Sequence, residues 1–285
     1  MTRPHVAAAL AAALGTTPFL AAAAQCRPPA SSHEARLLAF YEAPALFSMG
    51  SAPERLAAGA VSVGGEAIPV PSPDPAITHP SFCYQYTTNN TKLAPLFARP
   101  RIVVGLPAGF ALEGSYVPPI SVANARVTIG SVALSRTQSL FLGAERVLLQ
   151  VRAHGTLGRI HGPITCPRAS LQQDDPATPC YGTAPSRDSY DPKSLGVELA
   201  AGTQIGRLDV YAGGGANWLD PRFRAGFTDA LGNVDHTTVD VALVRGVAYG
   251  GATLHLRHDL AVSGQLYAVP ADVSTVRLGV AYRLR

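Results

Sequence analysis

The stretch Thr275-Val276-Arg277-Leu278-Gly279-Val280-Ala281-Tyr282-Arg283-Leu284 carries a large apolar side chain at every second position. The positions between them hold threonine, arginine, glycine and alanine. Successive side chains of a β-strand point to opposite faces, so this period of two predicts a strand with one apolar and one polar face.

The same period recurs along most of the chain from about Arg99 onward. The alternating segments are 147–154, 194–201, 207–218, 238–243, 254–257 and 265–268. Tight connections at 107–109, 202–206 and 257–259 alternate with long polar ones at 161–193 and 220–235. Nine strands from Arg99 onward and one near Ala58–Val70 predict an all-β fold, an antiparallel transmembrane β-barrel of about ten strands.

A soluble β-sandwich or a lipocalin-like barrel would also alternate. Two features favour the membrane barrel. Segments 121–136, 144–160 and 236–257 are longer than usual strands. The polar face also carries charges of both signs in mid-strand, which a soluble core would not accept unpaired.

The composition agrees with this class. Hydrophobic residues make up 47% and charged residues 15%, with 27 glycines and 24 prolines. Outside the extreme N-terminus, no apolar run is long enough for a membrane helix. The net charge of +4 is scattered along the chain, which excludes the clustered basic face that nucleic-acid binding requires.

The N-terminal residues predict export and a plug. Arg3, an alanine-rich apolar stretch and the A-x-A site at Ala22–Ala24 are typical of a signal peptide over 1–24. Ser31–Glu34 can cap a short helix that ends near Pro44. We therefore divide the chain into the signal peptide, an N-terminal segment 25–98 with helix or plug, first strand and loop, and a main barrel 99–285.

The four cysteines are Cys26, Cys83, Cys166 and Cys180. An even number in an exported chain favours disulfides, and Cys166–Cys180 bracket a loop-like segment, which leaves Cys26–Cys83 as the second pair. Zinc binding is the alternative, but the chain has no C-x-x-C pair. Lipidation of Cys26 is a further alternative, although bulky Gln25 precedes it.

The last strand supports the membrane assignment. Arg277, Gly279, Tyr282 and Leu284 resemble the terminal β-signal by which outer-membrane barrels are handed to their assembly machinery. The chain departs from that signal at its end, where Leu284 and Arg285 replace the usual aromatic residue. The resemblance implies an outer-membrane location, with the lipid bilayer and the assembly machinery as partners.

A second resemblance covers about forty residues. Ala43-Pro44-Ala45-Leu46, followed by Ala58-Gly59-Ala60-Val61, is similar to the early segment of FadL-like fatty-acid transporters, where an N-P-A-x-L-like motif precedes the first strand. Ala43 replaces the asparagine, and the chain is short for fourteen strands. The resemblance implies a plugged channel for hydrophobic solutes.

The polar faces of the predicted strands define the candidate site. The inward set is Arg126, Gln150, Arg152, His154, Glu198, Asp209, Asn217, Asp240, His255, Arg257, Gln265, Arg277 and Arg283. These side chains either line a path for small solutes, including hydrophobic ones, or form salt bridges that fill a narrow lumen. The first reading predicts a channel or transporter, and the second a closed structural or surface-interaction barrel.

Catalysis and metal binding have little support. His154, Glu198 and Asp209 with Ser194 or Ser263 contain the groups of a hydrolytic triad, but the chain has no G-x-S-x-G elbow. Asp174, Asp175, Asp188 and Asp191 lack calcium-loop spacing. We therefore expect no enzyme activity, no metal and no cofactor.

Overall fold

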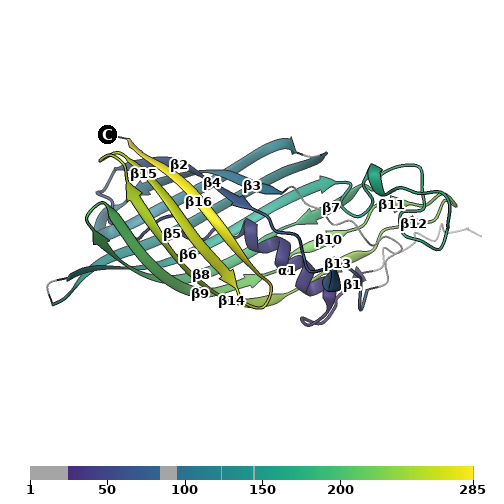
Figure 1. The fold of residues 1–285 in the computed structure, drawn as a ribbon, viewed down its shortest axis with the longest axis horizontal. Coiled ribbons are helices and arrows are strands. Elements are labelled where there is room, and N and C mark those ends of the chain that lie inside the picture. Colours follow the sequence, from purple (N-terminus) through teal and green to yellow (C-terminus); the bar gives the residue numbers. More distant parts are fainter. Residues whose placement is uncertain (1–24, 84–94, 123, 144, 285) are drawn as a thin grey trace, which may run out of the picture.

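The computed structural model describes residues 25–83, 95–122, 124–143 and 145–284. The predicted signal peptide lies outside them. Ten antiparallel strands form a closed barrel (Figure 1), as predicted. They are β2 (Val61–Pro69), β3 (Leu96–Gly105), β4 (Phe110–Val122), β5 (Ala125–Leu142), β6 (Glu145–Gly162), β8 (Lys193–Ile205), β9 (Leu208–Leu219), β14 (Leu243–His255), β15 (Leu260–Val269) and β16 (Val273–Leu284). The barrel closes where β16 pairs with β2.

The two ends of the barrel differ in their connections. At one end, which we call the turn end, β3 joins β4 through η2 (Pro107–Gly109), and residues 206–207 and 256–259 join two further strand pairs. The other end, called the loop end, carries the long connections 70–95, 163–192 and 220–242. Transmembrane barrels typically carry their long loops on one side of the membrane and have short turns on the other.

Short strands continue the sheet at the loop end. Next to β6 follow β7 (Asp188–Asp191), β10 (Arg222–Arg224), β13 (Thr238–Asp240) and β1 (Gln25–Cys26), and β11 (Phe227–Thr228) pairs with β12 (Val234–Asp235). The loops also contain η1 (Pro75–Ile77) and η3 (Arg168–Ser170). Both predicted disulfides, Cys26–Cys83 and Cys166–Cys180, are present here. They tie β1 to the β2–β3 loop and brace the β6–β8 connection.

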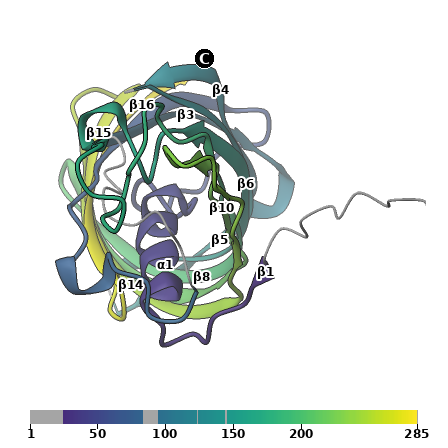
Figure 2. The same cartoon turned by 90° about the vertical axis from the view of Figure 1, so that its right-hand side faces the viewer.

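Helix α1 (His33–Ala45) lies inside the barrel, as the view from the loop end shows (Figure 2). Ser32 caps it by accepting a hydrogen bond from the Ala35 N–H at 3.1 Å, and ten of its thirteen residues are buried. The chain then runs through the lumen to the turn end, where β2 begins. The predicted N-terminal plug is thus present. Within the described residues no helix has the length and apolar character needed to cross a membrane.

The outside of the barrel is apolar. Aliphatic side chains on every second residue of the strands are exposed, among them Leu195, Val244, Leu266 and Leu278. The residues between them face the lumen and include buried charges such as Arg152 and Glu198. Contiguous apolar surface of this extent is rare on soluble proteins, so the exterior is built to contact lipid.

Two predicted strand boundaries are wrong. Segment 121–136 is not one strand, because β4 ends at Val122 and β5 starts at Ala125. Segment 236–257 is also divided, since β13 belongs to the loop-end extension and β14 starts at Leu243. In both places the alternation continues across a connection, which the period alone does not reveal.

Candidate functional site in the barrel lumen

The plug helix is fixed to the loop end at its start. Glu34 accepts hydrogen bonds from the backbone N–H groups of Ser81, Phe82 and Cys83, at 2.9, 2.8 and 2.7 Å. Burial alone would raise the pKa of this carboxyl, but the backbone donors outweigh it and lower the pKa below its usual value. Glu34, the last residue of the predicted capping motif, therefore anchors the β2–β3 loop.

The middle of the helix carries a buried acid. Glu42 is completely buried, and the Tyr190 hydroxyl donates to its Oε2 at 2.7 Å. Burial raises the pKa of Glu42 to about 7, because a charged carboxylate loses its hydration inside the protein. The helix thus carries a titratable group in its contact with β7.

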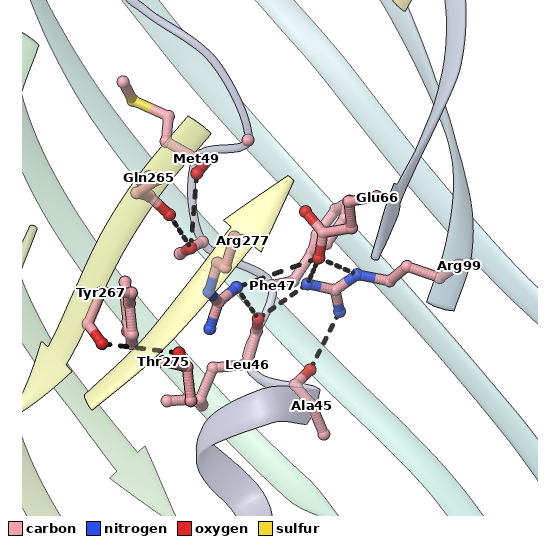
Figure 3. A network of polar contacts seen from close by, with 12 residues as sticks. Ala45, Leu46, Phe47, Met49, Glu66, Arg99, Gln265, Tyr267, Thr275 and Arg277 are labelled. Atoms are coloured by element: carbon pink, nitrogen blue, oxygen red, sulfur yellow. Dashed lines mark hydrogen bonds and ion pairs between the residues drawn. The ribbon is translucent and has the colours of Figure 1, made fainter. Parts of the chain in front are cut away.

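The C-terminal end of α1 is capped by arginines of the barrel wall (Figure 3). Arg99 donates to the carbonyls of Ala45 and Leu46 at 3.0 and 2.8 Å. Arg277 donates to those of Leu46 and Ala43, both at 2.9 Å. The last carbonyls of a helix have no partner within the helix, and its C-terminal end carries partial negative charge. The two guanidinium groups satisfy both requirements.

Phe47, the second residue after the helix, is enclosed by cations. The guanidinium carbons of Arg99, Arg101 and Arg152 lie 4.7, 4.5 and 4.9 Å from the centre of its ring. Phe47 is fully buried, so these cation–π contacts are desolvated and strong. Arg99, Arg101, Arg152 and Arg277 are called the arginine cluster below.

Three glutamates balance the arginine cluster. Glu66 accepts from Arg99 Nε at 2.7 Å and from Arg101. Glu113 bridges Arg101 and Arg152, the latter at 2.7 Å. Glu198 lies 3.6 Å from Arg152. Four positive charges thus face three negative charges and the negative helix end, so the lumen is filled by a paired network that holds the plug.

Several predicted lumen residues meet in this network. Arg152, Glu198 and Arg277 belong to it, and His154 Nε2 lies 3.5 Å from Glu198 Oε1. Three others line the lumen nearer the turn end. Asp209 contacts His255 Nε2 at 2.7 Å, and Arg283 pairs with Glu54 of the plug segment.

Three predicted lumen residues do not face the lumen. Arg126 lies on the outer face of β5 and is exposed, because buried Ile129 fixes the inward phase of that strand. Asp240 belongs to β13, beyond the barrel, where it pairs with Arg222. Arg257 is exposed in the turn between β14 and β15. The alternation predicts polar positions along the strands, but it does not show where each barrel strand begins and ends.

The sequence reasoning also missed four members of the network. Glu66, Arg99, Arg101 and Glu113 lie on β2, β3 and β4. A usable signal was present, since Arg101 and Glu113 alternate with Ile102 and Leu112, which are exposed on the outer face. Pro100 between the two arginines obscured that strand.

The residues of the proposed terminal β-signal divide between the two faces of β16. Arg277 joins the arginine cluster, and Gly279 lies where a Cβ atom would be 2.4 Å from Ser263 Oγ. Tyr282 and Leu284 are on the outer face, exposed to 45% and 44%. The aromatic and final apolar side chains therefore meet the lipid-facing surface.

One seam of the barrel is incomplete. Strands β3 and β4 pair only from Ile102↔Gly114 to Gly105↔Ala111. Nearer the loop end, β3 remains paired with β2 up to Leu96, and β4 with β5 up to Val122, but not with each other. The wall therefore parts between these two strands over their loop-end halves.

Prolines explain where the seam parts. The Leu106 N–H donates to Phe110 O, which makes Val104↔Leu112 and Ile102↔Gly114 the following hydrogen-bonded pairs. The next such pair would join residue 100 to residue 116, and the one after it 98 to 118. Pro100 and Pro118 have no N–H, so each of these pairs lacks one donor. The seam ends at the first missing donor.

An apolar cavity of about 110 Å³ lies at the parted seam. Tyr41, Pro44 and Ala45 of α1 form its inner side. Phe97, Val117, Ile120 and Ile129 are among the wall residues that complete it, together with Leu96. Leu96 and Ile120 are exposed to 52% and 47%, so the cavity reaches from the buried helix to side chains at the barrel surface.

The groups of a hydrolytic triad are not assembled in the described residues. Ser263 Oγ donates to Gly50 O at 2.6 Å, and His154 has no hydrogen bond to Ser263 or Ser194 there. Gly196 separates Ser194 from Glu198 on the lumen face of β8. Likewise, 25–83, 95–122, 124–143 and 145–284 contain no group of three or more His, Cys, Asp or Glu side chains that could hold a metal ion.

No family model and no curated protein matches the chain. The solved structures similar to it include the attachment invasion locus protein Ail of Yersinia pestis, with TM-score 0.30, 10% identity, and 80% of this chain and 100% of that chain covered. The outer membrane protease OmpT from Escherichia coli has a TM-score of 0.39 and 7% identity, with 79% of this chain and 94% of that chain covered. The translocator domain of the autotransporter NalP from Neisseria meningitidis has a TM-score of 0.30 and 10% identity, with 81% of this chain and 91% of that chain covered. Similarities at these scores and identities carry no function over to this chain.

Proposed function

We propose that the protein is an outer-membrane barrel that binds small lipophilic molecules, which enter from the lipid through the parted β3–β4 seam. The observation that carries this proposal is the apolar cavity, because it is lined both by the buried plug helix and by exposed residues of the unpaired strands. A lipophilic molecule in the membrane would reach the cavity without crossing water.

The membrane placement follows from the surface. The aliphatic exterior requires lipid, and the short turns face the periplasm in barrels of this kind, which would put the loop end outside. Disulfides at the loop end suit an oxidising compartment. The terminal β-signal resemblance supports insertion by the outer-membrane assembly machinery.

An axial pore fits the geometry less well. The helix, Phe47 and the arginine cluster occupy the lumen, and the charges there are used to hold the plug. We also propose that the protein is not an enzyme, because its histidine, serine and acidic side chains in the described lumen do not form a relay.

The size of the cavity limits the ligand. An engineered apolar cavity of about 150 Å³ holds benzene, so a cavity of this order takes a short alkyl chain or one small ring. The lining offers few polar groups, apart from the Tyr41 and Tyr190 side chains. Linear alcohols such as 1-octanol are suitable probes, because the end of the alkyl tail would fill the cavity while the rest of the molecule lies in the open seam.

Native mass spectrometry of the refolded protein with 1-octanol tests the proposal. Ile129→Trp fills the cavity from β5, and Ala45→Leu fills it from α1. Val132→Trp is the matched control, because Val132 lies on the outer face of the same strand with 55% exposure. Wild type and control should retain octanol, and the filled variants should lose it while keeping heat-modifiable gel mobility. Undiminished octanol binding by folded Ile129→Trp and Ala45→Leu would overturn the proposal.

Planar-bilayer recording distinguishes the proposed plugged barrel from an axial channel. A silent wild-type barrel is expected, since the plug closes the lumen. Clear single-channel steps would instead favour an axial channel. A barrel that is silent and binds no octanol would leave the closed structural or surface-interaction role, which the filled lumen also supports.

A further inference from the structure

Polar side chains gather on the outer face of the barrel where β5 and β6 meet the loop end. Arg126, Thr128, Arg159 and His161 surround a shallow hollow of about 500 Å³, whose remaining walls are Pro119 and Gly158. Arg126 lies directly opposite His161 in the strand register, and Thr128 opposite Arg159. These four residues are called the basic patch below.

The phase of the two strands shows that the basic patch faces outward. Ile129 on β5 and Arg152 on β6 are buried in the lumen, 2% and 1% exposed. Residues at odd distances from them therefore point to the outer face, as Arg126, Arg159 and His161 do. All three are exposed.

The basic patch borders the apolar exterior. Toward the turn end, the outward residues that follow it are Val132 and Leu134 on β5, after Gly130, and Leu157 on β6. These aliphatic side chains are exposed to 55%, 48% and 63%. In a membrane, the residues next to the apolar belt lie at the level of the lipid headgroups.

The patch has more positive charge than its protein partners neutralise. Arg159 is paired with Asp191, with Nε 2.7 Å from Oδ1. Arg126 has no ion pair in the described part of the chain, although it stands opposite His161, whose ring can also donate. Two donors facing one another across strands favour an anion between them, and guanidinium groups match phosphate oxygens in geometry.

We propose that the basic patch binds the phosphate of an outer-leaflet lipid headgroup and so fixes the depth of the barrel next to the β3–β4 seam. The patch lies on the outer face of β5 and β6, and β4, which supplies its Pro119 wall, separates it from the β3–β4 seam. This inference rests on the membrane placement proposed above but not on ligand binding in the cavity.

The refolded barrel in vesicles tests the proposal. Vesicles of phosphatidylcholine, with and without phosphatidic acid, would be solubilised and the lipids retained by the protein counted by native mass spectrometry. The test variant is Arg126→Gln with His161→Gln, two exposed side chains. Arg136→Gln is the matched control, since Arg136 is also exposed on the outer face of β5 but lies nearer the turn end.

Wild type and Arg136→Gln should prefer phosphatidic acid to phosphatidylcholine, and the double variant should lose about fivefold of that preference, as expected for one interfacial cation. Octanol retention should not change, which separates this result from a failure of the proposed function. An unchanged lipid preference in the double variant would overturn the proposal. Displacement of phosphatidic acid by inorganic phosphate would overturn the choice of a lipid, since the patch would then bind a free anion.

Discussion

Strands β3 and β4 differ between their two halves. In the turn-end half they are hydrogen-bonded to each other from Ile102↔Gly114 onward. Glu113 of this half and Arg101, the residue next to Ile102 on β3, hold the plug through ion pairs. In the loop-end half they part, and their inward side chains include Phe97 and Val117, which meet the same plug in an apolar cavity. The same two strands thus form a charged wall toward the turn end and an open, apolar wall toward the loop end. The boundary between the two lies where Pro100 and Pro118 remove N–H donors from the β3–β4 ladder.

The charged contacts with the plug should be more sensitive to substitution than the apolar cavity. Glu66→Ala leaves Arg99, Arg101 and Arg277 without their shared carboxylate, and removing one partner of a buried ion pair costs about 3–5 kcal/mol. We expect a lower urea midpoint, protease cleavage in residues 25–60 and new conductance in planar bilayers. Glu54→Ala is the control, because its pair with Arg283 is about half exposed and should contribute about 0–1 kcal/mol. Equal effects of the two variants would show that the network does not hold the plug.

A second change releases the plug from its other end. Cys83→Ser opens the disulfide to Cys26, which spans 57 residues of sequence and encloses α1 and all of β2. Loss of a disulfide of this loop length destabilises by about 4 kcal/mol in the chain-entropy account. Unfolding of the plug, followed by hydrogen exchange in α1, should occur at lower urea while the barrel strands stay protected. Cys180→Ser, which opens only the loop within the β6–β8 connection, should leave exchange in α1 unchanged.

The third prediction is a pH dependence of stability caused by Glu42 of α1, the helix that both halves of β3 and β4 contact. Glu42 has its pKa raised from the usual 4.5 to about 7 by burial, so the folded protein keeps a proton that the unfolded chain releases between these values. The stabilisation is complete below about pH 4.5 and is lost as the pH rises through 7, at roughly 1.4 kcal/mol per pH unit at most. Urea unfolding of wild type and Glu42→Gln at several pH values measures it. The free energy of unfolding of wild type should fall relative to that of Glu42→Gln from pH 5 to pH 7 and then stay at a constant offset. An offset that does not depend on pH would contradict the raised pKa of Glu42.

Much of the fold is predictable because lipid and lumen impose opposite polarity on alternate residues. The rows Val276–Leu284 and Arg277–Arg283 show it in β16, and the strand number and disulfide pairs follow from similar local signals. The strand ends are less visible. The short β13 continues the alternation of β14 without belonging to the barrel, and for this reason the alternation wrongly predicts that Asp240 faces the lumen.

The contacts between the plug and the barrel wall cannot be predicted from the sequence. Phe47 meets Arg99 and Arg152, residues that lie far along the chain, and nothing local marks that meeting. The seam is an intermediate case. Pro100 and Pro118 are evident in the sequence, but only the register shows that their missing N–H groups belong to consecutive pairs of one ladder.

The smallest expected change in stability tests the comparison most directly. Pro100→Val together with Pro118→Val restores the donors of the next two hydrogen-bonded pairs of the β3–β4 ladder, each worth about 0.5–1.5 kcal/mol. We expect a slightly higher urea midpoint, slower amide exchange at residues 100 and 118 than in the flanking unpaired positions, and weaker octanol retention, because the strands would close over the cavity. Pro107→Ala, in the turn at the other end of the same strands, restores an N–H without extending the ladder and should leave octanol retention unchanged. If the double variant gained stability and still bound octanol as wild type does, the ligand would reach the cavity by a route other than this seam.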